Sequence, residues 1–201
     1  MSVRGTLIAL GAALFTAGAF AQGTSALLPR LENPGYENPA IAAGAEPGGR
    51  PVGWLDFASE GGSVAGITDE KKRGGVQSIL LKCQEKEDAF HGLYQKFAAA
   101  ANHRYTFSIY ALNDANDPLV GNSYGQLGIE WKAKDGQEIS RVHGPLWNFE
   151  LSATRWEKFA VEGTAPEGAD HGIATMTFFS KDSGGFGTCY IDDADIDVKR
   201  K

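Results

Sequence analysis

Several segments of the chain alternate apolar and polar residues with a period of two, the pattern of a β-strand with one buried face. In residues 104–111, every second side chain from Tyr105 to Ala111 is apolar or aromatic. Residues 127–133 repeat the pattern, and Asp135-Gly136 follows as a hairpin-type turn. Further strands are predicted over 76–84, 93–97, 157–164, 172–179 and 188–198.

No segment shows a sustained apolar period of 3.6 residues, which an amphipathic helix would require. The run 97–101 favours a helix but is too short to nucleate one alone, so we expect a turn there. Residues 38–52, rich in Pro, Ala and Gly, predict a long irregular connection. About eight short strands and 26 glycines predict an all-β protein, a single antiparallel β-sandwich.

The first residues have the features of a cleaved signal peptide. Arg4 precedes an uncharged apolar run from Leu7 to Phe20, and Ala19-Phe20-Ala21 supplies small residues at the cleavage site. The run is short for a membrane span, and no second apolar stretch approaches the required length. We therefore expect a secreted protein, periplasmic or extracellular, with a signal peptide at 1–21, a flexible leader at 22–30 and one domain over 31–199.

Charge and cysteine content narrow the function classes. The chain has 19 Lys and Arg against 25 Asp and Glu, and no basic face that would indicate a nucleic-acid partner. Cys83 and Cys189 each lie in a predicted strand. In an oxidising compartment they could form a disulfide, or both could be buried thiols, and the sequence leaves these alternatives open.

Eight short motifs follow one another along the chain. They are Asn33-Pro34-Gly35-Tyr36-Glu37, Pro51-Val52-Gly53-Trp54, Gly75-Val76-Gln77-Ser78-Ile79-Leu80, Gly92-Leu93-Tyr94-Gln95, Tyr105-Thr106-Phe107-Ser108, Trp156, Thr164-Ala165-Pro166-Glu167-Gly168-Ala169 and Tyr190-Ile191-Asp192-Asp193. Their order resembles that of CenC-type carbohydrate-binding modules. The resemblance covers about residues 31–198. It implies a jelly-roll β-sandwich of the galactose-binding-like type.

The resemblance also implies a non-catalytic domain that binds a poly- or oligosaccharide and works alongside separate glycoside hydrolases. Two other functions stay open: a small glycoside hydrolase or lyase on the same fold, and a surface adhesion domain that binds protein. Hydrolysis by a carboxylate pair needs two acids across a sugar, and outward-facing Glu130 has no partner that the sequence identifies.

Jelly rolls of this type commonly hold a structural calcium ion, and the resemblance implies its ligands here. The matching positions are Glu37, Asp192 and the Asp69-Glu70 loop, with backbone carbonyls near Arg73-Gly74. Calcium prefers six to eight oxygen ligands, and carboxylates from distant segments suit it. Asp193 is the alternative ligand, because strand parity places it on the face opposite Asp192. The other possibility is that these carboxylates are ordinary surface groups or pair with nearby cations.

Sugar-binding sites combine aromatic rings with polar side chains, and this criterion selects the candidate glycan-binding residues. Trp54, Trp131 and Trp156 are predicted in the core, whereas Trp147 lies in a polar segment, 143–148, and is predicted to be an exposed stacking residue. Tyr110 is the second predicted stacking residue. The remaining candidates are polar or aromatic residues that we expect to face outward from strands or loops: Glu130, Phe179, Gln95, Asn122, Tyr124 and Arg141.

Overall fold

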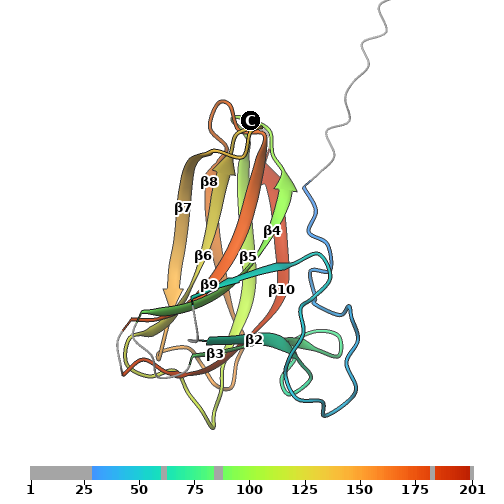
Figure 1. Cartoon of the computed structure of the whole chain (residues 1–201), viewed down its shortest axis with the longest axis vertical. Coiled ribbons are helices and arrows are strands. Elements are labelled where there is room, and N and C mark those ends of the chain that lie inside the picture. The colour runs from blue at the N-terminus through green and yellow to red at the C-terminus, as the bar shows by residue number, and fades with distance from the viewer. Residues whose placement is uncertain (1–28, 60–62, 84–87, 182–183, 200–201) are drawn as a thin grey trace, which may run out of the picture.

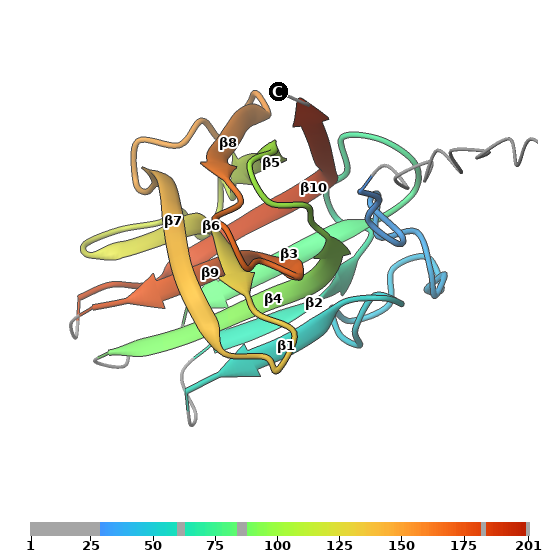
Figure 2. The ribbon, with the colours of Figure 1, turned by 90° about the horizontal axis from the view of Figure 1, so that it is seen from above.

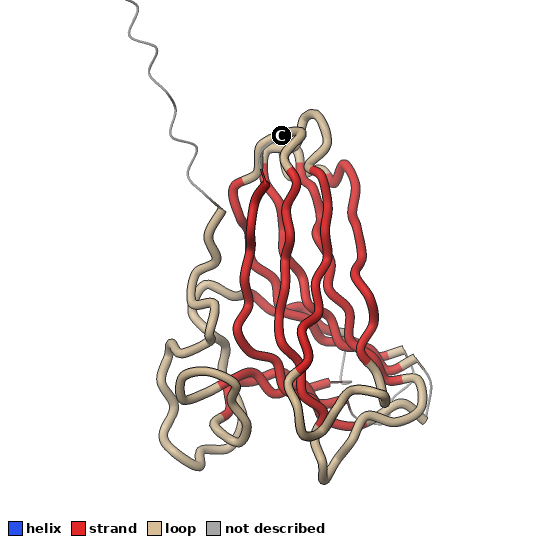
Figure 3. The backbone as a smooth tube through the Cα atoms, turned by 180° about the vertical axis from the view of Figure 1, so that it is seen from behind, coloured by secondary structure: helices blue, strands red, loops and turns tan. Residues whose placement is uncertain are grey.

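The computed structural model describes residues 29–59, 63–83, 88–181 and 184–199, and in these parts the chain forms ten strands and no helix (Figures 1 and 3). The predicted signal peptide and residues 22–28 of the predicted leader lie outside the described residues. The strands form two five-stranded sheets in which all neighbours are antiparallel. The predicted all-β, two-sheet antiparallel sandwich is confirmed.

We call the two sheets the front sheet and the back sheet. The front sheet has the order β1-β4-β9-β6-β7, with bounds Leu55–Ala58, Ala89–Ala98, His171–Ser180, Ser123–Lys132 and Glu138–Trp147. The back sheet has the order β2-β3-β10-β5-β8, with bounds Ser63–Thr68, Ser78–Cys83, Gly187–Lys199, Arg104–Asn113 and Glu157–Thr164. Figure 2, turned by 90°, shows the same ribbon from above.

The core lies between the sheets, where the inward side chains of both meet. Phe107 and Ile109 of β5 are fully buried, as the alternation predicts, and so are Leu127 and Ile129 of β6. Trp54 and Trp131 are each 1% exposed, so their predicted place in the core is correct. Removal of this apolar surface from water is the main stabilising contribution to the fold.

The segment before β1 packs beside the sandwich, as the blue chain in Figure 1 shows. Its residues Leu31, Tyr36 and Trp54 are buried and belong to the main core. The rings of Tyr36 and Trp54 are 5.4 Å apart, and the Tyr36 hydroxyl lies 3.6 Å from the Met176 sulfur on β9. Irregular backbone thus contributes large side chains to the core, which explains why the resemblance begins before the first strand.

Three strands were not predicted from the alternation: β1, β2 and β7. β7 includes residues 143–147 of the 143–148 segment that we expected to be a polar loop. It is an edge strand, and most of its side chains are partly or fully exposed. An edge strand with one wet face carries few apolar residues, and Gly144-Pro145 interrupts its pattern, so alternation does not reveal it.

A β-bulge interrupts β10 between Asp192 and Asp195, where the register against β5 shifts. Asp193 adopts a positive φ of 50°, and the Ala194 N–H donates to the Pro34 carbonyl, 2.8 Å away. The bulge breaks simple alternation, so the predicted placement of Asp193 opposite Asp192 is wrong. Both side chains face the same loop: the backbone N–H of Arg73 donates to Asp192, and its guanidinium pairs with Asp193.

Candidate functional site: a groove on the front sheet

A groove of about 260 Å³ lies on the outer face of the front sheet. Residues from five strands reach it, because outward side chains of neighbouring antiparallel strands lie side by side. Its aromatic residues come from β1, β4 and β9, and its polar residues come mainly from β6, β7 and β9. The lining side chains include Phe57, Phe90, Phe179, Gln126, Glu130, Arg141, His143, Thr175 and Thr177.

Two glycines shape this surface. Gly128 lines the groove on β6, and a Cβ there would lie 2.6 Å from the Thr175 hydroxyl oxygen. On β4, a Cβ at Gly92 would lie 2.3 Å from the Phe57 ring. Phe57 therefore packs directly over the β4 backbone. The absence of a side chain at Gly128 leaves room for the groove, and its absence at Gly92 lets the Phe57 ring pack against the β4 backbone.

The aromatic half of the groove is a run of neighbouring rings. Phe90 lies 6.1 Å from Phe57 and 6.3 Å from Phe179, measured between ring centroids. Tyr124 stacks on Phe179 with centroids 5.0 Å apart, and the Lys181 ammonium lies 5.4 Å from the Phe179 centroid. Such tilted and offset arrangements are favourable aromatic geometries. They form an apolar platform suited to a flat, partly apolar ligand.

The polar half ends in four charged side chains, Glu130, Lys132, Glu138 and Arg141, which we call the charge ring. Glu130 lies 2.9 Å from the Lys132 ammonium and 3.2 Å from the Arg141 guanidinium. Arg141 donates two 2.7 Å hydrogen bonds to Glu138, and Lys132 donates one of 3.0 Å. These bonds, chiefly that from Arg141, lower the pKa of Glu138 to about 2. Glu138 is therefore ionised at neutral pH.

Four predicted ligand residues come together here: Glu130, Phe179 and Arg141 line the groove, and Tyr124 stacks on Phe179. Sequence analysis missed Phe57, Phe90 and His143. Phe57 belongs to a four-residue strand too short for alternation to be read, and Phe90 precedes the predicted start of its strand. With the correct strand bounds, its two-residue spacing from Gly92 and Tyr94 would have placed Phe90 on the outer face.

Three other predicted ligand residues lie elsewhere. Trp147 is 1% exposed, 5.3 Å from Phe159 between ring centroids, so its expected exposure is wrong: the last residue of β7 points inward. Gln95 is also buried, and its amide binds the backbone of Glu32. Tyr110 lies on the back sheet, where the Arg73 guanidinium covers its ring at 3.5 Å.

Asn122, the remaining candidate, lies in the turn before β6. Its carbonyl accepts a 3.3 Å hydrogen bond from the Lys181 N–H. It is not among the groove-lining residues. Trp156, predicted in the core, is partly buried instead. It packs in a small apolar cluster with Leu80, Leu112 and Tyr190.

The predicted calcium ligands hold a loop through hydrogen bonds. Asp192 accepts from the N–H groups of Arg73 at 2.7 Å, Gly74 at 3.1 Å and Asp193 at 2.7 Å. Both Glu37 carboxylate oxygens accept from the Val76 N–H. Burial raises the pKa of Asp192 despite these donors. Because N–H groups already face these oxygens, the donor set as arranged does not fit a cation shell.

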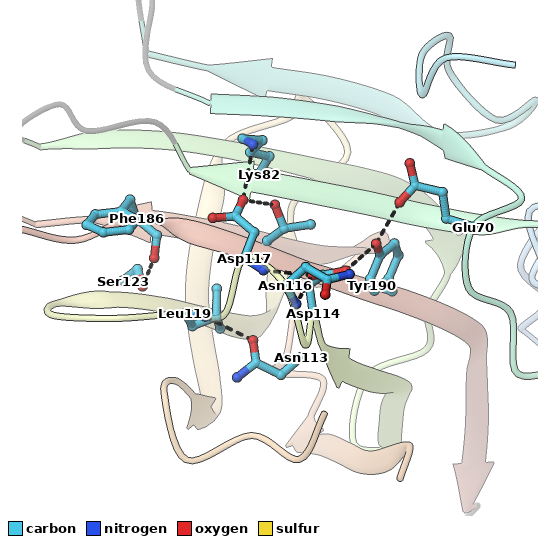
Figure 4. A network of polar contacts seen from close by, with 11 residues as sticks. Glu70, Lys82, Asn113, Asp114, Asn116, Asp117, Leu119, Ser123, Phe186 and Tyr190 are labelled. Carbon is cyan, nitrogen blue, oxygen red and sulfur yellow. Dashed lines mark hydrogen bonds and ion pairs between the residues drawn. The ribbon is translucent and has the colours of Figure 1, made fainter. Parts of the chain in front are cut away.

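Glu70, also predicted at the calcium site, belongs to a separate network on the back sheet (Figure 4). The Tyr190 hydroxyl lies 2.7 Å from Glu70 and 2.7 Å from Asp114. This network borders a second hollow of about 410 Å³, on the outer face of β3 and β10. Within the described residues, no three His, Cys, Asp or Glu side chains come together as a metal site. Calcium binding stays a prediction.

Cys83 and Cys189 are both buried and joined by no disulfide in this structure. They lie diagonally on neighbouring strands, since Cys83 is opposite Gly187 and Cys189 is opposite Leu81. Burial, with a smaller contribution from Cys83, raises the pKa of Cys189 to about 12. Both side chains are thus buried, and whether they pair in an oxidising compartment stays a prediction.

Comparisons with known proteins find the fold but no sequence family. No family model matches the chain, and no curated protein matches it. Among solved structures, the apo cyclase from Fischerella sp. has a TM-score of 0.61 at 16% identity, covering 86% of this chain and 96% of that one. The CBM22-1 xylan-binding domain of Paenibacillus barcinonensis Xyn10C has a TM-score of 0.51 at 16% identity, covering 81% and 99%.

A third structure contains a matching module inside a larger enzyme. The CBM22-1 and GH10 modules of Clostridium thermocellum xylanase 10B, solved with xylohexaose, give a TM-score of 0.53 at 13% identity. The match covers 74% of this chain and 26% of the xylanase chain. No helix in the described ranges is long and apolar enough to cross a membrane. The chain shares its β-sandwich fold with xylan-binding modules and with Stig cyclases.

Proposed function

We propose that the protein is a non-catalytic glycan-binding module, secreted as its N-terminus predicts, whose groove on the front sheet holds a poly- or oligosaccharide chain. The observation that carries the proposal is the division of the groove into an aromatic half and a polar half. A pyranose ring presents apolar C–H groups on its faces and hydroxyls on its rim. The phenyl rings suit the former, and Glu130, Gln126 and the threonines suit the latter.

The polar half does not favour hydrolysis. A glycosidase needs a carboxylic acid that holds its proton near neutral pH, opposite a second carboxylate. Glu138 is the acid nearest to Glu130 in the charge ring, and its pKa is lowered to about 2. It cannot serve as that proton donor. Among the described residues that line the groove, Glu130 is also the one carboxylate, so the lining lacks the second acid and supports binding over catalysis. We expect no product from any polysaccharide that the protein binds.

The first experiment is affinity electrophoresis in gels that contain soluble β-glucans, xylans, mannans or galactans. We expect one polymer to retard the wild type and to retard Phe179→Ala less, with affinity about three- to tenfold weaker. Tyr110→Ala is the matched control, since it removes a partly exposed ring from the back sheet. Free migration through every polymer, or an effect of Tyr110→Ala alone, contradicts the proposal.

A second candidate is a pocket for a small aromatic molecule. Three phenyl rings without polar atoms line the groove, and a matched Fischerella cyclase was solved in complex with an indole derivative. Calorimetry with indole and with a xylo-oligosaccharide distinguishes a pocket for an aromatic molecule from a glycan-binding groove. Heat from indole alone, lost in Phe179→Ala, favours this candidate over glycan binding.

A further inference from the structure

The charge ring contains one carboxylate in the groove and one outside it. Glu130 lines the groove, whereas Glu138 is not among the lining residues. Each Glu130 oxygen faces a different cation, Oε1 toward Arg141 and Oε2 toward Lys132. A carboxylate has about four acceptor positions, so Glu130 keeps positions for hydroxyl groups of a ligand.

Glu138 binds both cations without lining the groove itself. It accepts the paired bonds of the Arg141 guanidinium and shares the Lys132 ammonium with Glu130. A planar guanidinium that is bound at two points has a fixed orientation. Without the Glu138 charge, Glu130 would be the nearest anion for both cations, which would then compete with ligand hydroxyls for its oxygens.

The ring is also electrically balanced, with two acids and two bases. Glu138 therefore offsets one of the two positive charges beside the groove. Arg141 also lines the groove, but two of its donors are already bound to Glu138. A ligand carboxylate would therefore meet Glu130 at short range beside a cation whose charge is already paired, whereas a neutral sugar meets no such repulsion.

We propose that Glu138 is a positioning residue of the groove, which keeps Glu130 available to ligand hydroxyls and makes the groove prefer neutral oligosaccharides to those with a uronic acid. The inference rests on the proposed glycan function. It assigns the role to a residue that does not touch the ligand and acts through Arg141 and Lys132.

The test is calorimetry of two ligands: a neutral xylo-oligosaccharide and the same backbone with one glucuronic acid branch. We expect the wild type to prefer the neutral ligand. Glu138→Gln should bind the neutral ligand about three- to tenfold more weakly and should shift the ratio of the two affinities toward the acidic ligand by about tenfold. Glu138→Asp, which keeps the charge, should retain the wild-type preference.

The matched control is Glu162→Gln on β8, which removes a paired carboxylate from the back sheet, 3.1 Å from Arg104. It changes the net charge equally and should leave the ratio unchanged. An unchanged ratio in Glu138→Gln, the same shift in Glu162→Gln, or an equal loss for both ligands with a lowered Tm overturns the inference. If the wild type binds neither ligand, the inference is overturned, whereas the proposed function is overturned only by free migration through every polymer in the gels.

Discussion

Trp147 shows how a single residue can belong to the core while its neighbours in sequence are polar. A Cβ at Gly125, its partner on β6, would lie 1.9 Å from the indole ring. The indole therefore occupies the space that this glycine leaves, beside Phe159. The segment around Trp147 is polar because the other face of β7 is wet, so residue type alone did not distinguish an exposed ring from a buried one.

Trp147→Ala should lower the free energy of unfolding by about 3–5 kcal/mol, because it removes a large buried side chain and leaves a cavity. Urea denaturation measures the change. Phe149→Ala, two residues away and 58% exposed, is the control, with an expected change within about 0.5 kcal/mol. Loss of glycan binding in Trp147→Ala at unchanged stability would restore the surface role expected from the sequence.

Tyr190 has one hydroxyl proton and two carboxylate neighbours, Glu70 and Asp114. Burial and these carboxylates raise its pKa, so the hydroxyl stays protonated and can donate. Tyr190→Phe should cost about 1–3 kcal/mol of unfolding free energy, because the carboxylates lose their donor. The control is Tyr124→Phe, at a partly buried tyrosine whose ring stacks on Phe179. Equal small effects of both substitutions in urea denaturation would contradict the assigned role.

At the scale of elements, the β6–β7 hairpin carries the charge ring, and its stability depends on pH. The folded-state pKa of Glu138 is about 2, against an ordinary value of 4.5. A depressed pKa means that the ionised form stabilises the fold fully above pH 4.5 and that this contribution is lost as the pH falls toward 2. Protonation of Glu138 should therefore weaken the contacts that join β6 and β7 in this hairpin.

We expect the difference in Tm between wild type and Glu138→Gln to be largest above pH 5 and to shrink as the pH falls to 2. The raised pKa of Asp192 changes the stability in the opposite direction, because its protonated form stabilises the fold and is lost as the pH rises. Both proteins contain Asp192, so its contribution cancels in the difference in Tm. Thermal melts at several pH values measure the difference. A gap that does not change with pH would show that Glu138 does not make these bonds in solution.

The β10 bulge and the loop around Gly74 form a second element pair. Asp192→Asn should lower Tm in calcium and in chelator alike, because one amide oxygen cannot replace a carboxylate that accepts three N–H groups. The calcium site predicted from the sequence requires a further result, a higher Tm in calcium that Asp192→Asn abolishes. Equal wild-type melts in calcium and chelator contradict that site.

For the whole molecule, the sequence predicted what depends on local periodicity. The strands that cross the core, such as β5 and β6, alternate clearly and were found, whereas the edge strands β1, β2 and β7 were not. Glu130, Phe179 and Arg141 were selected as ligand residues because they lie on or beside readable strands. Phe57 and Glu138 gain their roles through contacts across strands, Phe57 with Gly92 and Glu138 with Lys132, which no pattern within one segment specifies.

The two buried thiols make the opening of the sandwich measurable through the rate of thiol labelling. Alkylating reagents attack the thiolate, and Cys189, whose pKa is raised to about 12, offers almost none while the sandwich is closed. In the reduced protein, the rate of labelling at Cys83 and Cys189 should therefore report how often β3 and β10 are exposed to solvent. A ligand that binds only the closed sandwich should slow that rate in proportion to its occupancy.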